Sequence, residues 1–223
     1  MKRIISFAMA VLMAAMACIE AEGRKKEDLI GIYPALAPYF SVPSSRTMSP
    51  DDQGFVRRWL LLKPESKPNR TNTLFVDSYV RENLDTGWNK GDDFMDTLTW
   101  HALDSRLFNV KLYRYAVGTE TGRYGLIFRV ITIVDCPEDL EDVRLAVGSN
   151  SASMWWIDGE EVLILSGDRR MVMDDAASRR LTLRKGRHVI TGSVINGPGM
   201  SDFCLRFIHE DGTPVLDYDV LKK

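Results

Sequence analysis

The sequence contains few of the residues that build metal sites. Its 223 residues include three histidines and three cysteines. His101, His188 and His209 are far apart, and none has a cysteine or a second histidine at the spacing of a zinc site. We therefore expect no cofactor. The one alternative is a structural Ca²⁺ at Asp174 and Asp175, because sandwich domains often hold this ion with carboxylates and backbone carbonyls.

The sequence also lacks an excess of charge of either sign. Lysine and arginine total 29, aspartate and glutamate total 31, and the net charge is −2. Proteins that bind nucleic acid or an anionic membrane surface usually carry a basic excess. We therefore expect neither as a partner, and contact with a membrane only through a lipid anchor.

Esterase motifs are absent as well. The sequence has no Gly-x-Ser-x-Gly, the motif that presents the nucleophile of many hydrolases. Gly167 and Asp168 are followed by Arg169 rather than serine, so the Gly-Asp-Ser block of a second esterase class is missing too. The missing motifs favour a protein without enzymatic activity, and an enzyme remains the alternative.

The one long apolar run that is not a strand candidate stands at the N-terminus. Lys2 and Arg3 precede an apolar stretch over residues 4–16, which predicts a signal peptide over residues 1–17. Cys18 follows Ala-Met-Ala, and this resembles a bacterial lipobox in which the cysteine is lipidated. The alternative is plain cleavage after Ala17 or a few residues later. We expect an exported protein: a periplasmic, outer-membrane or cell-surface lipoprotein, or a secreted one.

Residues 18–53 are predicted to form a linker or an extended arm that docks on the following domain. Prolines at Pro34, Pro38, Pro43 and Pro50 forbid a long helix and a central strand. An apolar island favours docking over a free linker. The side chains that would make the contact are Ile32, Tyr33, Leu36 and Phe40.

Residues 54–223 are predicted to form one all-β domain, a jelly-roll β-sandwich. Eight or more short apolar stretches are separated by turn residues at a spacing of roughly ten residues. The longest, Gly125–Val134, is apolar on both faces, which is typical of a central strand covered on both sides. Phe203, Leu205 and Phe207 alternate in a late strand and are predicted to form its inner face.

Residues 153–164 form the stretch on which the functional prediction depends. Asp158-Gly159 is typical of a type I′ β-hairpin turn, and it stands between two apolar segments. Trp155 and Trp156 are adjacent on the first strand, so their side chains point to opposite faces. If Trp155 enters the core, Trp156 is a candidate for stacking on a sugar ring. The alternative is that both indoles are packed, one in each layer.

A second candidate site follows the hairpin. Asp168, Arg169 and Arg170 form a polar loop whose arginines could bind the hydroxyls or carboxylates of a ligand. The alternative is a solvated turn in which an arginine pairs with Asp174 or Asp175.

Two further cysteines, Cys136 and Cys204, lie in the predicted domain. They would form either a disulfide, as in many exported proteins, or two buried free thiols.

The order of features from Val143 to Val215 resembles the jelly-roll accessory modules of the galactose-binding-like superfamily and, more loosely, PA14-like modules. Residues 55–62 and 100–105 look like modules carried by exported acetylxylan esterases of Bacteroidetes. The motifs that carry the resemblance are the Trp-Ile-Asp-Gly hairpin, Leu181–Gly186, Phe203–Phe207 and Asp211–Pro214.

The resemblance implies a non-catalytic exported module in a polysaccharide-degrading system. The module would bind either carbohydrate or a partner enzyme. The carbohydrate would be a polysaccharide or an oligosaccharide, for example a xylan-like one. A second hypothesis is an ancillary domain or fragment of an acetylxylan esterase. A third is a structural domain of a surface lipoprotein. An exposed aromatic side chain beside a groove would favour the first, and a buried Ser–His–acid cluster would favour the second.

Overall fold

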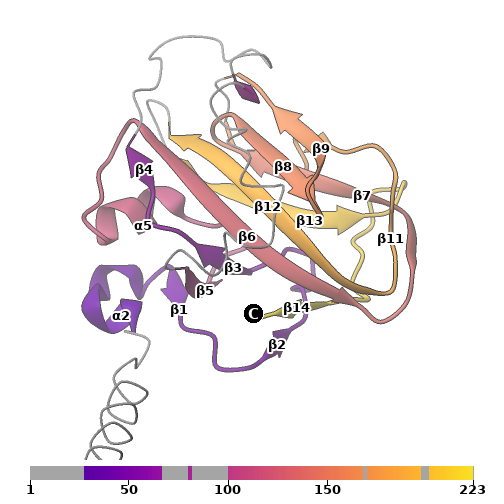
Figure 1. Cartoon of the computed structure of the whole chain (residues 1–223), viewed down its shortest axis with the longest axis horizontal. Coiled ribbons are helices and arrows are strands. Elements are labelled where there is room, and N and C mark those ends of the chain that lie inside the picture. Colours follow the sequence, from indigo (N-terminus) through magenta and orange to yellow (C-terminus); the bar gives the residue numbers. More distant parts are fainter. Residues whose placement is uncertain (1–27, 67–79, 82–99, 168–169, 197–200, 223) are drawn as a thin grey trace, which may run out of the picture.

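Antiparallel strand pairing builds most of the structure, a computed structural model that describes residues 28–66, 80–81, 100–167, 170–196 and 201–222. Two sheets face each other (Figure 1), which confirms the predicted β-sandwich. The larger sheet has the path β1 (Phe40–Ser41), β5 (His101–Ser105), β3 (Arg58–Leu61), β6 (Leu126–Cys136), β12 (Gly186–Asn196), β8 (Ser153–Ile157) and β9 (Glu160–Leu165).

Short strands complete both sheets. In the larger sheet, β4 (Glu65–Ser66) and β14 (Asp219–Leu221) pair with β6, and β2 (Thr47–Met48) pairs with β14. The smaller sheet is organised by β7 (Leu140–Ser149). One edge of β7 pairs with β13 (Phe203–Ile208), and the other pairs with β10 (Ala176–Ala177) and β11 (Leu181–Leu183).

The core lies between the two sheets, where the apolar side chains of alternate residues meet. The predicted inner face of β13 is confirmed, since Phe203, Leu205 and Phe207 are 0% exposed. The Trp155 ring lies 5.0 Å from that of Phe203, centroid to centroid. A Cβ at Gly192 on the neighbouring strand would lie 2.4 Å from the Trp155 ring, so only glycine leaves room for this indole.

The outer face of the larger sheet is also apolar around β8. Trp156 is 3% exposed and packs with Met154, Ile127 and Val80. The neighbouring strand β6 is buried on both faces, as predicted for the stretch Gly125–Val134. The sheet therefore carries one indole on each side, which is the packed alternative for the tryptophan pair.

Helical turns occur where the sequence predicted extended chain. The helix α5 (Leu112–Gly118) begins two residues after Val110, whose backbone bonds to Phe203. The arm contains α2 (Leu29–Ile32) and the 3₁₀ turn η1 (Pro34–Leu36). No helix in the described part of the chain is long and apolar enough to span a bilayer.

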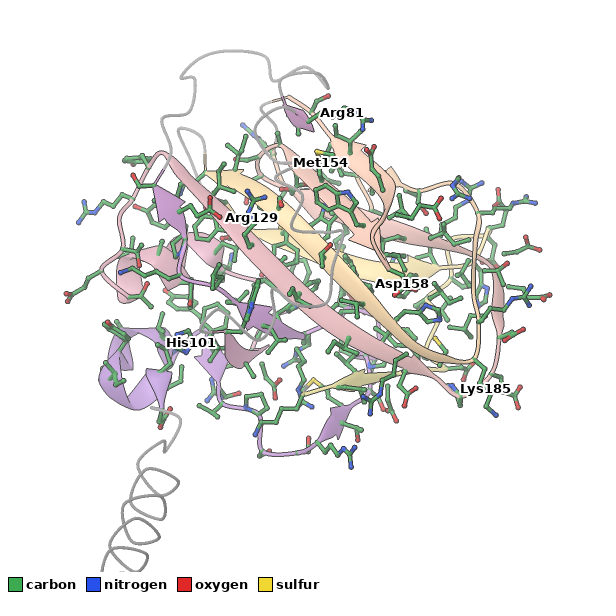
Figure 2. All side chains as sticks on the ribbon, in the orientation of Figure 1. Arg81, His101, Arg129, Met154, Asp158 and Lys185 are labelled. Carbon is green, nitrogen blue, oxygen red and sulfur yellow. The ribbon has the colours of Figure 1, made fainter. Side chains whose placement is uncertain are left out.

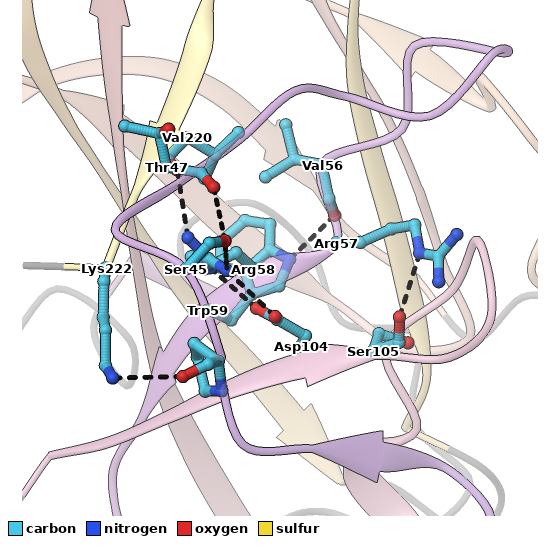
Figure 3. Close-up of polar contacts among 11 residues, drawn as sticks. Ser45, Thr47, Val56, Arg57, Arg58, Trp59, Asp104, Ser105, Val220 and Lys222 are labelled. Carbon is cyan, nitrogen blue, oxygen red and sulfur yellow. Dashed lines mark hydrogen bonds and ion pairs between the residues drawn. The ribbon is translucent and has the colours of Figure 1, made fainter.

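A buried ion pair fixes the arm and the C-terminal strand to the larger sheet (Figure 3). Arg58 Nε and Nη2 donate to the two carboxylate oxygens of Asp104 at 2.7 and 3.0 Å. The remaining guanidinium hydrogens reach Ser45 Oγ at 3.3 Å and the Val220 carbonyl at 3.5 Å. The side chains of Arg58 and Asp104 are 2% and 10% exposed, so the ion pair is shielded from water. Residues from three other parts of the chain therefore depend on one arginine.

Candidate functional site

A pocket of about 400 Å³ opens at the edge of the sandwich, and we call it the hairpin pocket. It receives residues from both sheets, because the β8–β9 turn stands opposite β11 and the start of β12. Figure 2 shows Asp158 at this edge, with Lys185 beyond it at the connection between β11 and β12. The lining residues are Ile157, Asp158, Glu160, Val162, Arg179, Arg180, Leu181, Thr182, Leu183 and His188.

The turn that forms one wall of the hairpin pocket has the predicted chemistry. Asp158 and Gly159 have φ angles of +52° and +81°, the left-handed conformations that a type I′ turn requires. Asp158 N–H donates to the Val189 carbonyl at 2.9 Å, and Val189 N–H donates to Asp158 Oδ1 at 2.8 Å. The turn is therefore fixed to β12 through both the backbone and the side chain of Asp158.

His188 connects this turn to the opposite wall. Its Nδ1 lies 2.6 Å from Asp158 Oδ2, and its Nε2 lies 2.7 Å from the Arg184 carbonyl oxygen. Both ring nitrogens are thus engaged, and neither is left to accept a proton from a serine hydroxyl. The arrangement therefore does not match a Ser–His–acid triad, in which the imidazole Nε2 accepts the nucleophile's proton.

The rim of the hairpin pocket carries charges of both signs. Arg179 contacts the Glu160 carboxylate, and Arg180 Nε donates to Glu210 Oε2 at 3.1 Å. Hydrogen bonds from Arg144, which has the larger effect, and from Arg180 lower the pKa of Glu210, so its carboxylate is ionised at neutral pH. These ion pairs are exposed, and exposed pairs are readily exchanged for contacts with a ligand.

The floor of the hairpin pocket is apolar, in contrast to its rim. Leu181 and Leu183 come from the smaller sheet, and Ile157 and Val162 come from the hairpin. Side chains that donate and accept hydrogen bonds therefore surround an apolar floor. This combination suits a small ligand with many hydroxyls and an apolar C–H face.

The tryptophans predicted to bind a ligand are not at a surface. Trp155 is 0% exposed and Trp156 is 3% exposed, which contradicts an exposed Trp156 available for stacking. The physical reason is that β8 is an inner strand of its sheet and is covered by apolar side chains on both faces. Neither indole lines the hairpin pocket.

The predicted polar loop is placed only in part. Asp168 and Arg169 lie outside the described residues, as does Cys18, and Arg170 is exposed. The carboxylate of Asp174 pairs with Arg206 of β13, whose Nε donates to Asp174 Oδ1 at 3.0 Å. Asp175 is exposed. Among the described residues, no group of three or more metal-binding side chains occurs.

The two cysteines of the domain are buried free thiols, so the disulfide alternative is wrong for this structure. Burial, with the charges of Asp135 and Asp158, raises the pKa of Cys136 to about 11. Burial is also the main reason why the pKa of Cys204 is raised to about 11. Neither thiol is therefore a nucleophile near neutral pH.

A second polar cluster lies at the opposite end of β12. Lys111 Nζ donates to Asp202 Oδ2 at 2.7 Å, and Asn196 Nδ2 donates to Ser201 Oγ at 3.1 Å. Asp202 is 2% exposed, and its burial raises the pKa of the carboxyl, although Lys111 opposes the shift. Because Lys111 already neutralises Asp202, this cluster serves to join α5 to the start of β13.

Most of the pocket residues were not singled out by the sequence. Asp158 and Glu160 were recognised only as parts of a hairpin turn. His188 carried no local signal, because its partner Asp158 is 30 residues earlier. The antiparallel register of β8 and β12, with Ile157 opposite Ile190, is the feature that brings the two side chains together.

The comparisons with known proteins yield distant structural likenesses. No family model and no curated protein matches the chain. The PA14 domain of the MpAFP antifreeze protein has 10% identity and a TM-score of 0.41, over 79% of this chain and 91% of that one. A PA14 sugar-binding domain from an RTX adhesin has 10% identity and a TM-score of 0.40, over 74% and 95%.

A third similar structure is a GH31 alpha-xylosidase from Xanthomonas citri, with 8% identity and a TM-score of 0.29 over 82% of this chain and 19% of the enzyme. Likenesses at this level say nothing about a ligand. The class of the protein is defined by its own strand pairing as an antiparallel β-sandwich with a pocket at one edge.

Proposed function

We propose that the chain is a non-catalytic module that binds carbohydrate in the hairpin pocket. The observation that carries the proposal is the apolar floor surrounded by hydrogen-bonding side chains. A sugar presents hydroxyls at its edge and C–H groups on its face, so it would satisfy both parts of this lining. A volume of about 400 Å³ lies in the lower range of small-molecule sites and suits one or two sugar rings.

The proposed setting is an exported polysaccharide-degrading system. Support comes from the signal-like segment over residues 1–17 and from the resemblance of residues 143–215 to galactose-binding-like accessory modules. In this setting Cys18 is the proposed lipid anchor, and a xylan-like chain or a partner enzyme is the proposed target. We do not favour the esterase hypothesis, because His188 has both nitrogens engaged.

The experiment is a calorimetric titration with xylose, xylo-oligosaccharides, galactose and galacturonic acid. We expect saturable binding with a dissociation constant of about 0.1–1 mM, as is usual for a small site without stacked aromatic rings. Arg180→Ala removes a rim donor and should weaken binding by about tenfold, the effect of one charged hydrogen bond.

The matched control is Arg187→Ala, which removes another exposed arginine, from β12, that does not line the hairpin pocket. Binding by this variant should equal that of the parent protein. The proposal is wrong if none of the sugars binds, or if the two substitutions weaken binding equally.

A further inference from the structure

We propose that His188 is a positioning residue that shapes the hairpin pocket only while its imidazole ring is protonated. The inference rests on the proposed function of that pocket and adds its regulation: acid conditions assemble the binding site, and mildly alkaline conditions loosen it. The geometry of the two ring nitrogens carries the argument.

The proton count follows from the partners of His188. A carbonyl oxygen cannot donate a hydrogen bond, so Nε2 must carry a hydrogen to bind the Arg184 carbonyl at 2.7 Å. Nδ1 faces Asp158 Oδ2 at 2.6 Å, and the other oxygen of Asp158 already accepts from Val189 N–H. A carboxylate accepts hydrogen bonds and does not donate them, so Nδ1 also carries a hydrogen. Both nitrogens donate only in the imidazolium form.

The hydrogen on His188 Nδ1 matters to Asp158 because the arginines that line the pocket are paired with other carboxylates. The rim arginines have other carboxylate partners, since Arg179 contacts Glu160 and Arg180 binds Glu210. The thiol of Cys136 on the adjacent strand β6 has a pKa raised to about 11 by burial and nearby acids, so it stays neutral. The charged groups that line the hairpin pocket with His188 are Asp158, Glu160, Arg179 and Arg180, and the Cys136 thiol is close enough to Asp158 and Asp135 to feel their charges.

Loss of the proton breaks one of the two bonds of His188. If Nε2 keeps its hydrogen, the lone pair of Nδ1 faces the Asp158 carboxylate and repels it. If Nδ1 keeps its hydrogen, the bond to the Arg184 carbonyl is lost. In either case His188 keeps only one of the two bonds by which it joins the β8–β9 turn to Arg184, the residue that follows β11, and both this turn and β11 line the hairpin pocket.

The test is nuclear magnetic resonance of the full mature chain without ligand, at about pH 5.5 and about pH 8, on either side of the range where histidine titrates. At the lower pH both ring nitrogens of His188 should carry hydrogen. At the higher pH one proton is lost. If Nδ1 loses it, the exchange protection of the Val189 amide should fall by about tenfold or more, since the repelled Asp158 carboxylate is its acceptor. If Nε2 loses it, the hydrogen bond to the Arg184 carbonyl should be lost instead.

Two variants separate this effect from general destabilisation. His188→Gln cannot become charged, so its Val189 protection should be low at both pH values. The matched control is His209→Gln, which removes an exposed histidine outside the hairpin pocket and should behave as the parent does. A single ring hydrogen on His188 at the lower pH overturns the proposal, and so does a ring that loses its proton while the Val189 protection and the hydrogen bond to the Arg184 carbonyl are both unchanged.

The same titration separates this inference from the proposed function. A sugar of the panel that binds at about pH 5.5 should bind about tenfold more weakly at about pH 8, and equal binding at the two values overturns the regulation. If no sugar binds at either pH while the ring and Val189 behave as expected, the proposed ligand is wrong and the protonated His188 is upheld.

Discussion

Replacement of Arg58 by methionine should be among the most damaging single substitutions in this protein. The change leaves the Asp104 carboxylate buried without its partner, and Ser45 and Val220 lose a shared donor. Removal of one partner of a buried ion pair typically costs about 3–5 kcal/mol. For a domain of this size each kcal/mol lowers the melting temperature by about 2–4 °C, so the expected decrease is about 6–20 °C.

The chain offers a close control for this measurement. Arg57 is the preceding residue, is half-buried, and donates to the Ser105 carbonyl at 2.9 Å, its one hydrogen bond to the described residues. Arg57→Met should therefore cost about 1 kcal/mol in urea denaturation. The double variant Arg58→Met, Asp104→Leu should recover most of the loss, because no buried charge then remains. Equal losses for the two arginine variants, or a double variant less stable than Arg58→Met, would refute the reasoning.

Three further predictions concern the interior. Lys111→Met should lower the free energy of unfolding by about 3 kcal/mol at neutral pH. This decrease should become smaller on acidification, because burial raises the pKa of Asp202 and the protonated carboxyl no longer needs a cationic partner. A decrease that is independent of pH in urea denaturation would contradict this. Cys136 and Cys204, with pKa values of about 11, should resist an aromatic disulfide reagent at about pH 8 until the chain is unfolded, and rapid labelling of the folded protein would contradict this. Gly192→Ala should lower the melting temperature because its Cβ would clash with an indole ring, whereas an unchanged value would show that the strand adapts.

Features of the fold that depend on neighbours in sequence were predictable. Asp158-Gly159 defines its turn through the backbone freedom of two adjacent residues, and the structure has the left-handed angles that the pair implied. The alternation that ends at Phe207 likewise identified the inner face of β13. The helix α5 was missed although Leu112, Tyr115 and Ala116 are buried at helical spacing, because seven residues give too short a pattern to outweigh the β-rich surroundings.

Features that depend on distant contacts were not predictable from the sequence. Whether Trp156 is exposed depends on what covers the outer face of its sheet, and alternation along β8 cannot show that cover. His188 and Asp158 meet through strand register, and the partner of Asp174 is Arg206, 32 residues later in the sequence. The candidate site therefore emerged from the pairing of strands and not from a motif.

The most direct test of the central claim is a map of amide chemical-shift changes on titration with the same sugars. If the hairpin pocket binds carbohydrate, the largest saturable changes should appear at Gly159, Glu160, Thr182 and Val189. Changes confined to the exposed loop that carries Arg170, or the absence of change with every sugar, would contradict the account and move the site away from this edge of the sandwich.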